Sequence, residues 1–191
     1  MPDDSQPPDL GGTPGPAEQT TYQAVRYAFP TGQPFPDFVA RYEAAVPSAR
    51  DDLFADQDWG KIAERTDALA EHGFLIYARI SPSRAISLAG RNQARSMVYL
   101  MGNHMIAERM YRHHAGVMLY APLRVEIYED GAGDAVFSVD KPSMAFGSFS
   151  NDEITAVGHE LDRKLAALLD FLGVPGPASA RLSPGAPTAN P

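Results

Sequence analysis

Three side chains that could act together are spaced four residues apart in one short stretch of the sequence. His104, Glu108 and Arg112 would share one face of a helix, and His113 follows directly. A histidine and a carboxylate at this spacing can ligate one metal ion, but a metal site needs a third or fourth ligand. The same spacing is common in exposed pairs that stabilise a helix. Three interpretations therefore stay open: a structural pair, a metal or haem site at His104 or His113, and a catalytic site.

A second candidate is Arg124, which lies on an apolar, β-rich segment two residues after Pro122. A buried guanidinium is costly unless it is paired. We therefore expect Arg124 to face a bound anion or one of the nearby carboxylates, which are Glu108, Glu126 and Asp130. Lys141 and Ser143 follow the next strand and could reach the same place. The candidate binding residues are therefore Asn103, His104, Glu108, Arg112, Tyr120, Arg124, Lys141 and Ser143.

Motifs of the common enzyme classes do not occur in the chain. Phosphate loops, nucleophile elbows, dinucleotide fingerprints and paired-histidine zinc helices all fail to match, and His159 is followed by Arg163 where a second zinc ligand would stand. His159 also lies opposite the leucine face of its helix, which predicts a solvent-exposed side chain. The sequence thus names no reaction, no catalytic residue and no cofactor.

Composition narrows the possible partners. The chain has no cysteine, which removes disulfides and thiolate chemistry and fits a reducing compartment. Its net charge of −8 argues against a nucleic-acid binder. No apolar stretch approaches the roughly 20 residues of a membrane helix, and the start lacks the apolar region of a signal peptide. We therefore predict a cytoplasmic protein that binds neither nucleic acid nor a membrane.

Apolar periodicity predicts the elements that must position these residues. Helical spacing occurs over residues 35–46, 59–70, 105–116 and 152–172, with a short helix over 82–90. Strands are expected over residues 22–29, 74–80, 97–101, 117–128 and 135–139, with a bend at Pro122. This pattern predicts a single α+β domain over residues 21–173, with a mainly antiparallel sheet packed against helices. The Pro/Gly-rich ends, residues 1–20 and 174–191, are predicted to be disordered tails.

Several short motifs resemble, in order and spacing, the domain of unknown function 302 family. They are Gly102-Asn103, Ile106-Ala107-Glu108-Arg109-Met110, Tyr120-Ala121-Pro122-Leu123-Arg124, Tyr128-Glu129-Asp130 and Lys141-Pro142-Ser143. The resemblance covers about residues 60–170. It implies a compact α+β fold, often dimeric, with no assigned reaction.

Three functional hypotheses follow. The first is a non-catalytic domain that holds a small apolar or anionic ligand between the sheet and the helix beginning near His104, with Arg124 as anchor. The second is a haem or metal protein that uses His104 or His113 with a methionine, since six of the seven methionines lie between Met97 and Met144. The third is a dimeric interaction module, in which a second copy is the partner.

Overall fold

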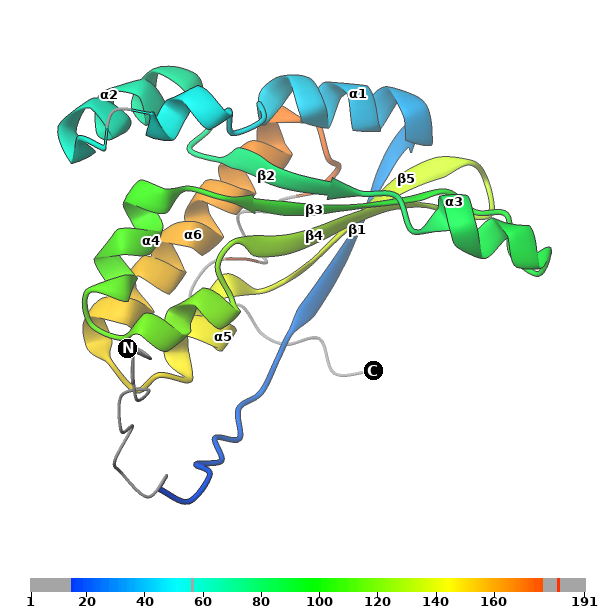
Figure 1. Ribbon diagram of the computed structural model, residues 1–191. Coiled ribbons are helices and arrows are strands. Elements are labelled where there is room, and N and C mark those ends of the chain that lie inside the picture. The colour runs from blue at the N-terminus through cyan, green and yellow to red at the C-terminus, as the bar shows by residue number, and fades with distance from the viewer. Residues whose placement is uncertain (1–14, 56, 177–181, 183–191) are drawn as a thin grey trace, which may run out of the picture.

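Alternating apolar residues build one antiparallel sheet of five strands in the order β1-β5-β4-β3-β2 (Figure 1). The computed structural model describes residues 15–55, 57–176 and 182. Every strand pairs antiparallel with its neighbours. The strands are β1 Arg26–Pro34, β2 Leu75–Ile80, β3 Ser96–Gly102, β4 Leu123–Glu129 and β5 Asp134–Asp140.

Helices cover one face of this sheet (Figure 1). Within the described part of the chain the α-helices are α1 Phe35–Ala45, α2 Trp59–Leu69, α3 Ser83–Ile86, α4 His104–Tyr111, α5 Pro142–Gly147 and α6 Asp152–Phe171. Three 3₁₀ turns are η1 Asp51–Phe54, η2 Ser87–Ala89 and η3 Ala115–Leu119. The predicted α+β class, with an antiparallel sheet packed against helices, is confirmed.

Aromatic side chains join α1 to the centre of the sheet. The ring of Phe38 packs edge-on against Phe137 of β5, and Tyr42 contacts both Phe137 and Tyr99 of β3. All four are fully buried, and α6 adds its leucine stripe to the same core. Burial of large aromatic and aliphatic side chains is the main favourable contribution to folding. The core therefore lies between one sheet face and these two helices.

The ends of the long helices follow the capping residues expected from the sequence. Asn151 precedes α6, and its side chain accepts a hydrogen bond from the backbone N–H of Ile154 at 2.9 Å. Asp58 caps α2 in the same way through Lys61. Both caps satisfy N–H groups that the first helical turn leaves without partners. The sequence therefore predicted the starts of both helices correctly.

The segment before β4 differs from the prediction. The expected helix over residues 105–116 ends at Tyr111, and the first half of the expected strand over 117–128 is the turn η3, followed by a cis peptide between Ala121 and Pro122. The His114 side chain accepts a hydrogen bond from the backbone N–H of Gly116 at 3.0 Å. Local bonds of this kind favour a turn over an extended strand.

The edge strand β2, expected as a strand over residues 74–80, is buried only in its first half. Leu75 and Ile76 are buried, whereas Ile80 is 50% exposed. The reason is that β2 is the last strand of the sheet, so it has a neighbouring strand on one side only. An apolar run can therefore mark an edge strand as well as a central one.

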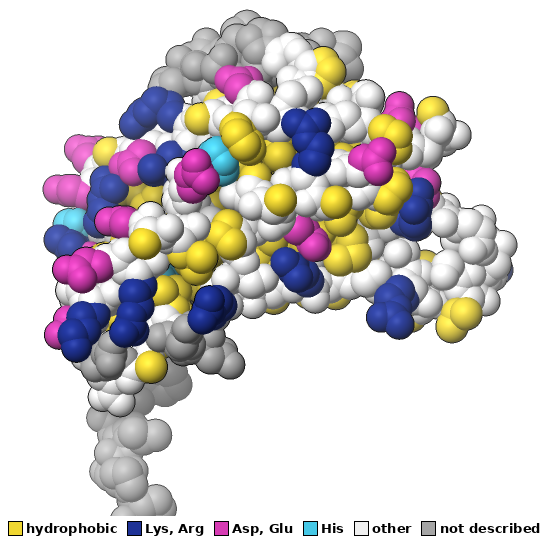
Figure 2. Space-filling model, turned by 90° about the horizontal axis from the view of Figure 1, so that it is seen from above, with side chains coloured by type: hydrophobic (Ala, Val, Ile, Leu, Met, Phe, Trp, Pro, Cys, Tyr) yellow, Lys and Arg dark blue, Asp and Glu magenta, His cyan; other side chains and the backbone are white. Residues whose placement is uncertain are grey.

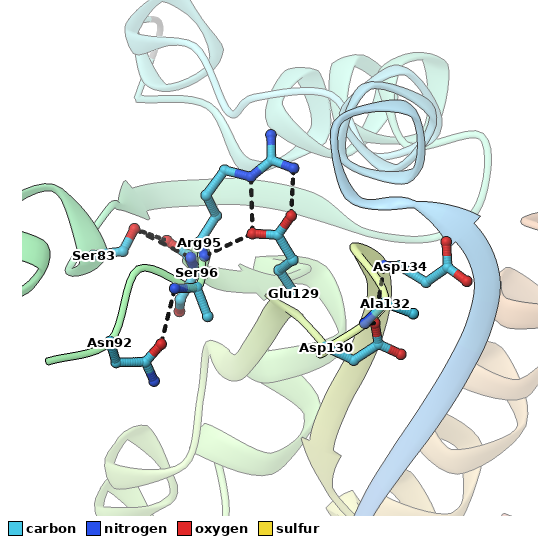
Figure 3. A network of polar contacts seen from close by, with 9 residues as sticks. Ser83, Asn92, Arg95, Ser96, Glu129, Asp130, Ala132 and Asp134 are labelled. Atoms are coloured by element: carbon cyan, nitrogen blue, oxygen red, sulfur yellow. Dashed lines mark hydrogen bonds and ion pairs between the residues drawn. The ribbon is translucent and has the colours of Figure 1, made fainter.

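Polar contacts fasten the segment between β2 and β3 to the sheet. Arg95 makes a bidentate ion pair with Glu129 of β4, with nitrogen–oxygen distances of 2.6 and 3.1 Å (Figure 3). This contact lowers the pKa of Glu129 to about 2. The Ser83 hydroxyl meanwhile bonds to the backbone of Ser96. The connecting segment that contains α3 is thus held at both of its ends.

Most of the residues of the predicted tails lie outside the described part of the chain. Residues 15–20 are exposed and have no regular structure. Val174 and Leu182 belong to the main core, at 5% and 1% exposure, and both lie beyond the predicted domain end at residue 173. Among the described residues, no helix combines the length and the apolar character that a membrane span requires.

The leucine stripe of α6 leads to a stability prediction. Leu165 is fully buried at the centre of the helix. Leu165→Ala should lower the free energy of unfolding by about 2 to 5 kcal/mol, because it removes buried methyl groups and leaves a cavity. Urea denaturation measures this change, with the exposed Arg163→Ala on the same helix as control. A loss below about 1 kcal/mol would contradict the observed packing.

Candidate functional site

An apolar cavity of about 260 Å³ lies where β3 ends and α4 begins. Its walls come from the end of β3, α4, η3, the cis-proline turn and the helices α5 and α6. The lining residues are Tyr77, Gly102, Asn103, His104, Ile106, Ala107, Met110, Met118, Ala121, Pro122, Leu123, Phe146 and Leu161. Only three of them carry a polar side chain. The cavity is large enough for an organic molecule, because engineered apolar cavities of about 150 Å³ already bind benzene.

Gly102 allows the cavity wall to close tightly. A Cβ atom at this position would lie 3.3 Å from the Cβ atom of Pro122 and 3.7 Å from the ring of Tyr77. The missing side chain therefore lets the end of β3 lie directly against the cis-proline turn.

The polar atoms of Asn103 are used within the fold. Its side-chain oxygen accepts a hydrogen bond from the backbone N–H of Met105 at 2.9 Å, which caps α4. Its amide donates to the backbone carbonyl of Gly73 at 3.2 Å. Asn103 therefore fastens the start of α4 to the turn before β2.

Both ring nitrogens of His104 are also engaged. Nε2 lies 2.8 Å from the Thr66 hydroxyl and Nδ1 lies 2.7 Å from the Tyr77 hydroxyl. Thr66 already donates its one proton to the carbonyl of Ile62, so it accepts from Nε2–H. Because burial opposes a second proton on the ring, Nδ1 keeps its lone pair and accepts from the Tyr77 hydroxyl, whose oxygen also accepts from the backbone N–H of His104. These bonds assign a neutral imidazole with its proton on Nε2.

The surroundings of His104 favour this neutral form. The rings of Phe54, Trp59 and Tyr77 pack edge-on around the imidazole, at centroid distances of 5.2, 6.2 and 6.3 Å. Burial lowers the pKa of His104 below its ordinary value. His104 therefore joins α2, β2 and α4 without a charge.

This arrangement bears on metal binding. A metal ion at either ring nitrogen of His104 would displace Thr66 or Tyr77. His113 follows the end of α4 and is exposed. Among the residues that the structure describes, no three His, Asp or Glu side chains come together in a way that could hold an ion. A metal ion or haem at His104 would therefore compete with two existing hydrogen bonds, and this alternative stays a prediction.

Glu108 and Arg112 form the surface pair that their spacing predicted. The two side chains make an i,i+4 ion pair, which lowers the pKa of Glu108. On the next helical position Arg109 pairs with Glu160 of α6 at 2.9 Å. Charged side chains of both signs lie side by side on the surface seen in Figure 2. Neither Glu108 nor Arg112 lines the cavity.

Arg124 is exposed, and the expectation that it is a buried group was wrong. Its neighbours Leu123 and Val125 are buried in the core, and side chains alternate along a strand, so Arg124 points to the opposite face of the sheet. The apolar residues beside it in the sequence are the ones that face the core. Arg124 therefore cannot anchor a ligand inside the cavity.

Lys141 and Ser143 meet a buried aspartate that the sequence analysis did not single out. Asp162 of α6 is fully buried, and its Oδ1 accepts from the backbone N–H of Ser143 at 3.1 Å. Its Oδ2 lies 4.0 Å from Lys141 Nζ and 3.7 Å from Nδ1 of His159. Burial is the main cause that raises the pKa of Asp162. His159, predicted to be exposed, is partly exposed, with a buried Nδ1 atom turned to this carboxylate.

Tyr120 lies in a separate hollow of about 470 Å³ on the far side of Pro122 and Leu123. Its ring packs edge-on against Tyr22, Phe146 and Phe149. Arg124 and Lys141 also border this hollow. The eight candidates are therefore divided. Asn103 and His104 line the cavity, and four others border the hollow or reach Asp162, namely Tyr120, Arg124, Lys141 and Ser143. The last two, Glu108 and Arg112, form the surface ion pair.

Sequence reasoning missed three residues that complete these contacts, namely Thr66, Tyr77 and Asp162. Asp162 left a signal, because it follows Leu161 inside an apolar helix stripe. Thr66 and Tyr77 left none, because their contacts with His104 span 38 and 27 residues.

Comparisons with known proteins agree with the fold and the motifs. The model of the family described as domain of unknown function DUF302 matches residues 60–172. The chain belongs to this family. A crystal structure of an uncharacterized conserved DUF302 protein from Bacillus stearothermophilus has a TM-score of 0.58 and 16% identity, and the match covers 76% of this chain and 95% of that one. A search of curated proteins finds no match.

The state of His104 leads to a pH prediction. The unfolded chain takes up a proton on this histidine near pH 6.5, while in the folded protein burial lowers the pKa. The free energy of unfolding should therefore fall as the pH drops below about 6.5, and His104→Gln should flatten this fall. Urea denaturation at several pH values measures it. The exposed His113→Gln should keep the wild-type profile, and equal flattening in both variants would contradict the assignment.

The buried carboxylate leads to a second stability prediction. Asp162→Asn removes the negative charge of the buried carboxylate that accepts from Ser143 and faces Lys141, so the free energy of unfolding should fall by about 3 to 5 kcal/mol. The double variant Lys141→Met/Asp162→Leu removes both charges and should recover part of this loss. Thermal and urea unfolding measure both variants. A double variant less stable than Asp162→Asn would show that the pair acts differently.

Proposed function

We propose that this member of the DUF302 family binds a small, neutral, apolar molecule in the cavity between β3, α4 and the cis-proline turn. The observation that carries the proposal is the lining of that cavity. Its walls are apolar, and the polar groups at its edge already bond to the protein. Pockets that are mainly apolar and few per protein are the usual binding sites for small molecules.

The charge of the lining favours a neutral ligand over an anion. Among the described residues that line the cavity none is Lys or Arg, and the bonds and burial of His104 favour its neutral form. A buried anion would lack a partner for its charge, which is costly in an apolar environment. The lining of this cavity therefore supports an apolar ligand and gives no support to an anionic one.

The hydrogen bonds at the edge of the cavity support binding without chemistry. A general base needs an accessible lone pair, and that of His104 accepts the Tyr77 hydroxyl. Burial raises the pKa of Tyr77, which opposes its ionisation. We therefore propose a binding protein rather than an enzyme, and its lack of cysteine suits the cytoplasm.

Binding of a neutral apolar fluorophore tests the proposal. We expect N-phenyl-1-naphthylamine to gain fluorescence with the wild-type protein and to lose most of this gain with Ala107→Phe. Ala107 lines the cavity from α4, so the larger ring would occupy the ligand space. Native mass spectrometry of protein purified from its own host adds a second measurement, since a retained ligand appears as added mass.

A matched control separates filling of the cavity from a general effect of a new aromatic side chain. Ala40→Phe makes the same change at an exposed position of α1 and should bind the fluorophore like the wild type. Circular dichroism checks that both variants fold. Equal binding by wild type and Ala107→Phe would overturn the proposal.

A further inference from the structure

The hollow that contains Tyr120 is a second space, and the proposed function makes no use of it. It has a volume of about 470 Å³ and lies where β4 begins and β5 ends, beside α5. Binding pockets for small organic molecules commonly have volumes of about 300 to 1,000 Å³. Pro122, Leu123 and Phe146 belong to the walls of both this hollow and the apolar cavity. The molecule therefore has two neighbouring spaces that share part of their walls.

Aromatic side chains form one wall of the hollow. The ring of Tyr120 packs edge-on against Tyr22 at a centroid distance of 5.8 Å and against Phe146 at 6.3 Å. Leu119, which also lines the hollow, is 79% exposed. A ligand that covers these side chains removes apolar surface from water, and an aromatic ligand can stack on the tyrosine rings or meet them edge-on. This wall therefore suits an aromatic body.

The charges at the hollow leave one cation unbalanced. Among the described residues that line it, Arg124, Lys141 and Asp140 are charged. Asp140 forms an ion pair with Arg26 at 3.5 Å, and the Lys141 ammonium lies 4.0 Å from the buried carboxylate of Asp162. Within the part of the chain that the structure describes, Arg124 has no acidic side chain at ion-pair distance. Arg124 is therefore the cation that a ligand can pair with.

A guanidinium at this place favours a ligand with an acidic group. Its planar N–H groups donate two parallel hydrogen bonds to a pair of acidic oxygens, and hydrogen bonds between charged groups are stronger than those between neutral ones. The apolar cavity offers no such group, because its described lining includes neither Lys nor Arg. The two spaces therefore suit ligands of different charge.

We infer that this hollow is a second binding site, which takes a small aromatic anion. The acidic group pairs with Arg124, and the ring lies against Tyr22, Leu119 and Tyr120. Sites of this kind use an apolar wall for contact area and a few polar groups to orient the ligand. The inference goes beyond the proposed function, since the hollow has other walls than the cavity and its ligand carries a charge.

Two fluorophores that differ mainly in charge separate the two sites. 1-Anilinonaphthalene-8-sulfonate has the skeleton of N-phenyl-1-naphthylamine with an added sulfonate, and we expect it to gain fluorescence with the full chain. Arg124→Gln should raise the dissociation constant of the sulfonate at least about fivefold, because the charge-assisted hydrogen bonds are lost. Binding of the neutral fluorophore should not change. Ala107→Phe, which fills the cavity, should keep the binding of the sulfonate.

Competition tests the chemical class of the ligand. 1-Naphthoate should displace the sulfonate, whereas the neutral 1-naphthylmethanol should need a concentration at least about fivefold higher, because it cannot form an ion pair. Inorganic phosphate carries charge without an apolar body and should compete poorly, since the aromatic wall then stays uncovered. Equal displacement by naphthoate and naphthylmethanol, or by naphthoate and phosphate, would contradict an aromatic anion.

Controls assign a change in binding to Arg124 itself. Arg84→Gln removes an exposed arginine of α3 and should bind both fluorophores like the wild type. Arg124→Lys keeps the charge without the planar donors and should lose less affinity than Arg124→Gln. A cooperative urea transition shows that each variant folds. Sulfonate binding that is absent, or unchanged in Arg124→Gln, would overturn the inference, whereas failure of the neutral fluorophore to bind would overturn the proposed function alone.

Discussion

Successive side chains of a β-strand point to opposite faces, and in β4 this rule places Leu123 at the cavity and Arg124 on the opposite face of the sheet. The same alternation places Tyr99 and Met101 in the core and Val98 and Leu100 on the outside. Because helices cover only one face, the alternation separates the molecule into two surfaces with different chemistry. A shift of β4 by one residue would exchange them, so the register decides what each surface can bind.

His104 shows how hydrogen bonds within a fold can leave a histidine without a free ring nitrogen for catalysis. At the start of α4 its imidazole lies between a hydroxyl from α2 and a hydroxyl from β2, and each bond determines the direction of the next. A fully satisfied polar network of this kind makes the local structure more rigid and more specific. The network borders the apolar cavity and leaves it without an exposed charge. Positioning of the cavity wall therefore explains this histidine better than catalysis does.

Asp162 poses the opposite physical problem, a carboxylate inside the core. Close packing of α5 on α6 makes its burial possible, since a Cβ atom on Gly158 would lie 3.0 Å from the Cα atom of Ser143. The carboxylate accepts a hydrogen bond from the backbone N–H of Ser143 in the first turn of α5, and the Lys141 ammonium lies nearby. A buried charge of this kind contributes to the specific placement of one helix on another more than to overall stability.

The sequence by itself determined the α+β class, the starts of α2 and α6 at Asp58 and Asn151, and the exposed Glu108–Arg112 pair. These features depend on periodicity, capping and neighbours within one helical turn, all of which are local. Tertiary structure alone decided that Arg124 faces outward and that His104 meets Thr66 and Tyr77. Each of these depends on contacts between segments far apart in the chain, and local sequence patterns carry no record of such contacts.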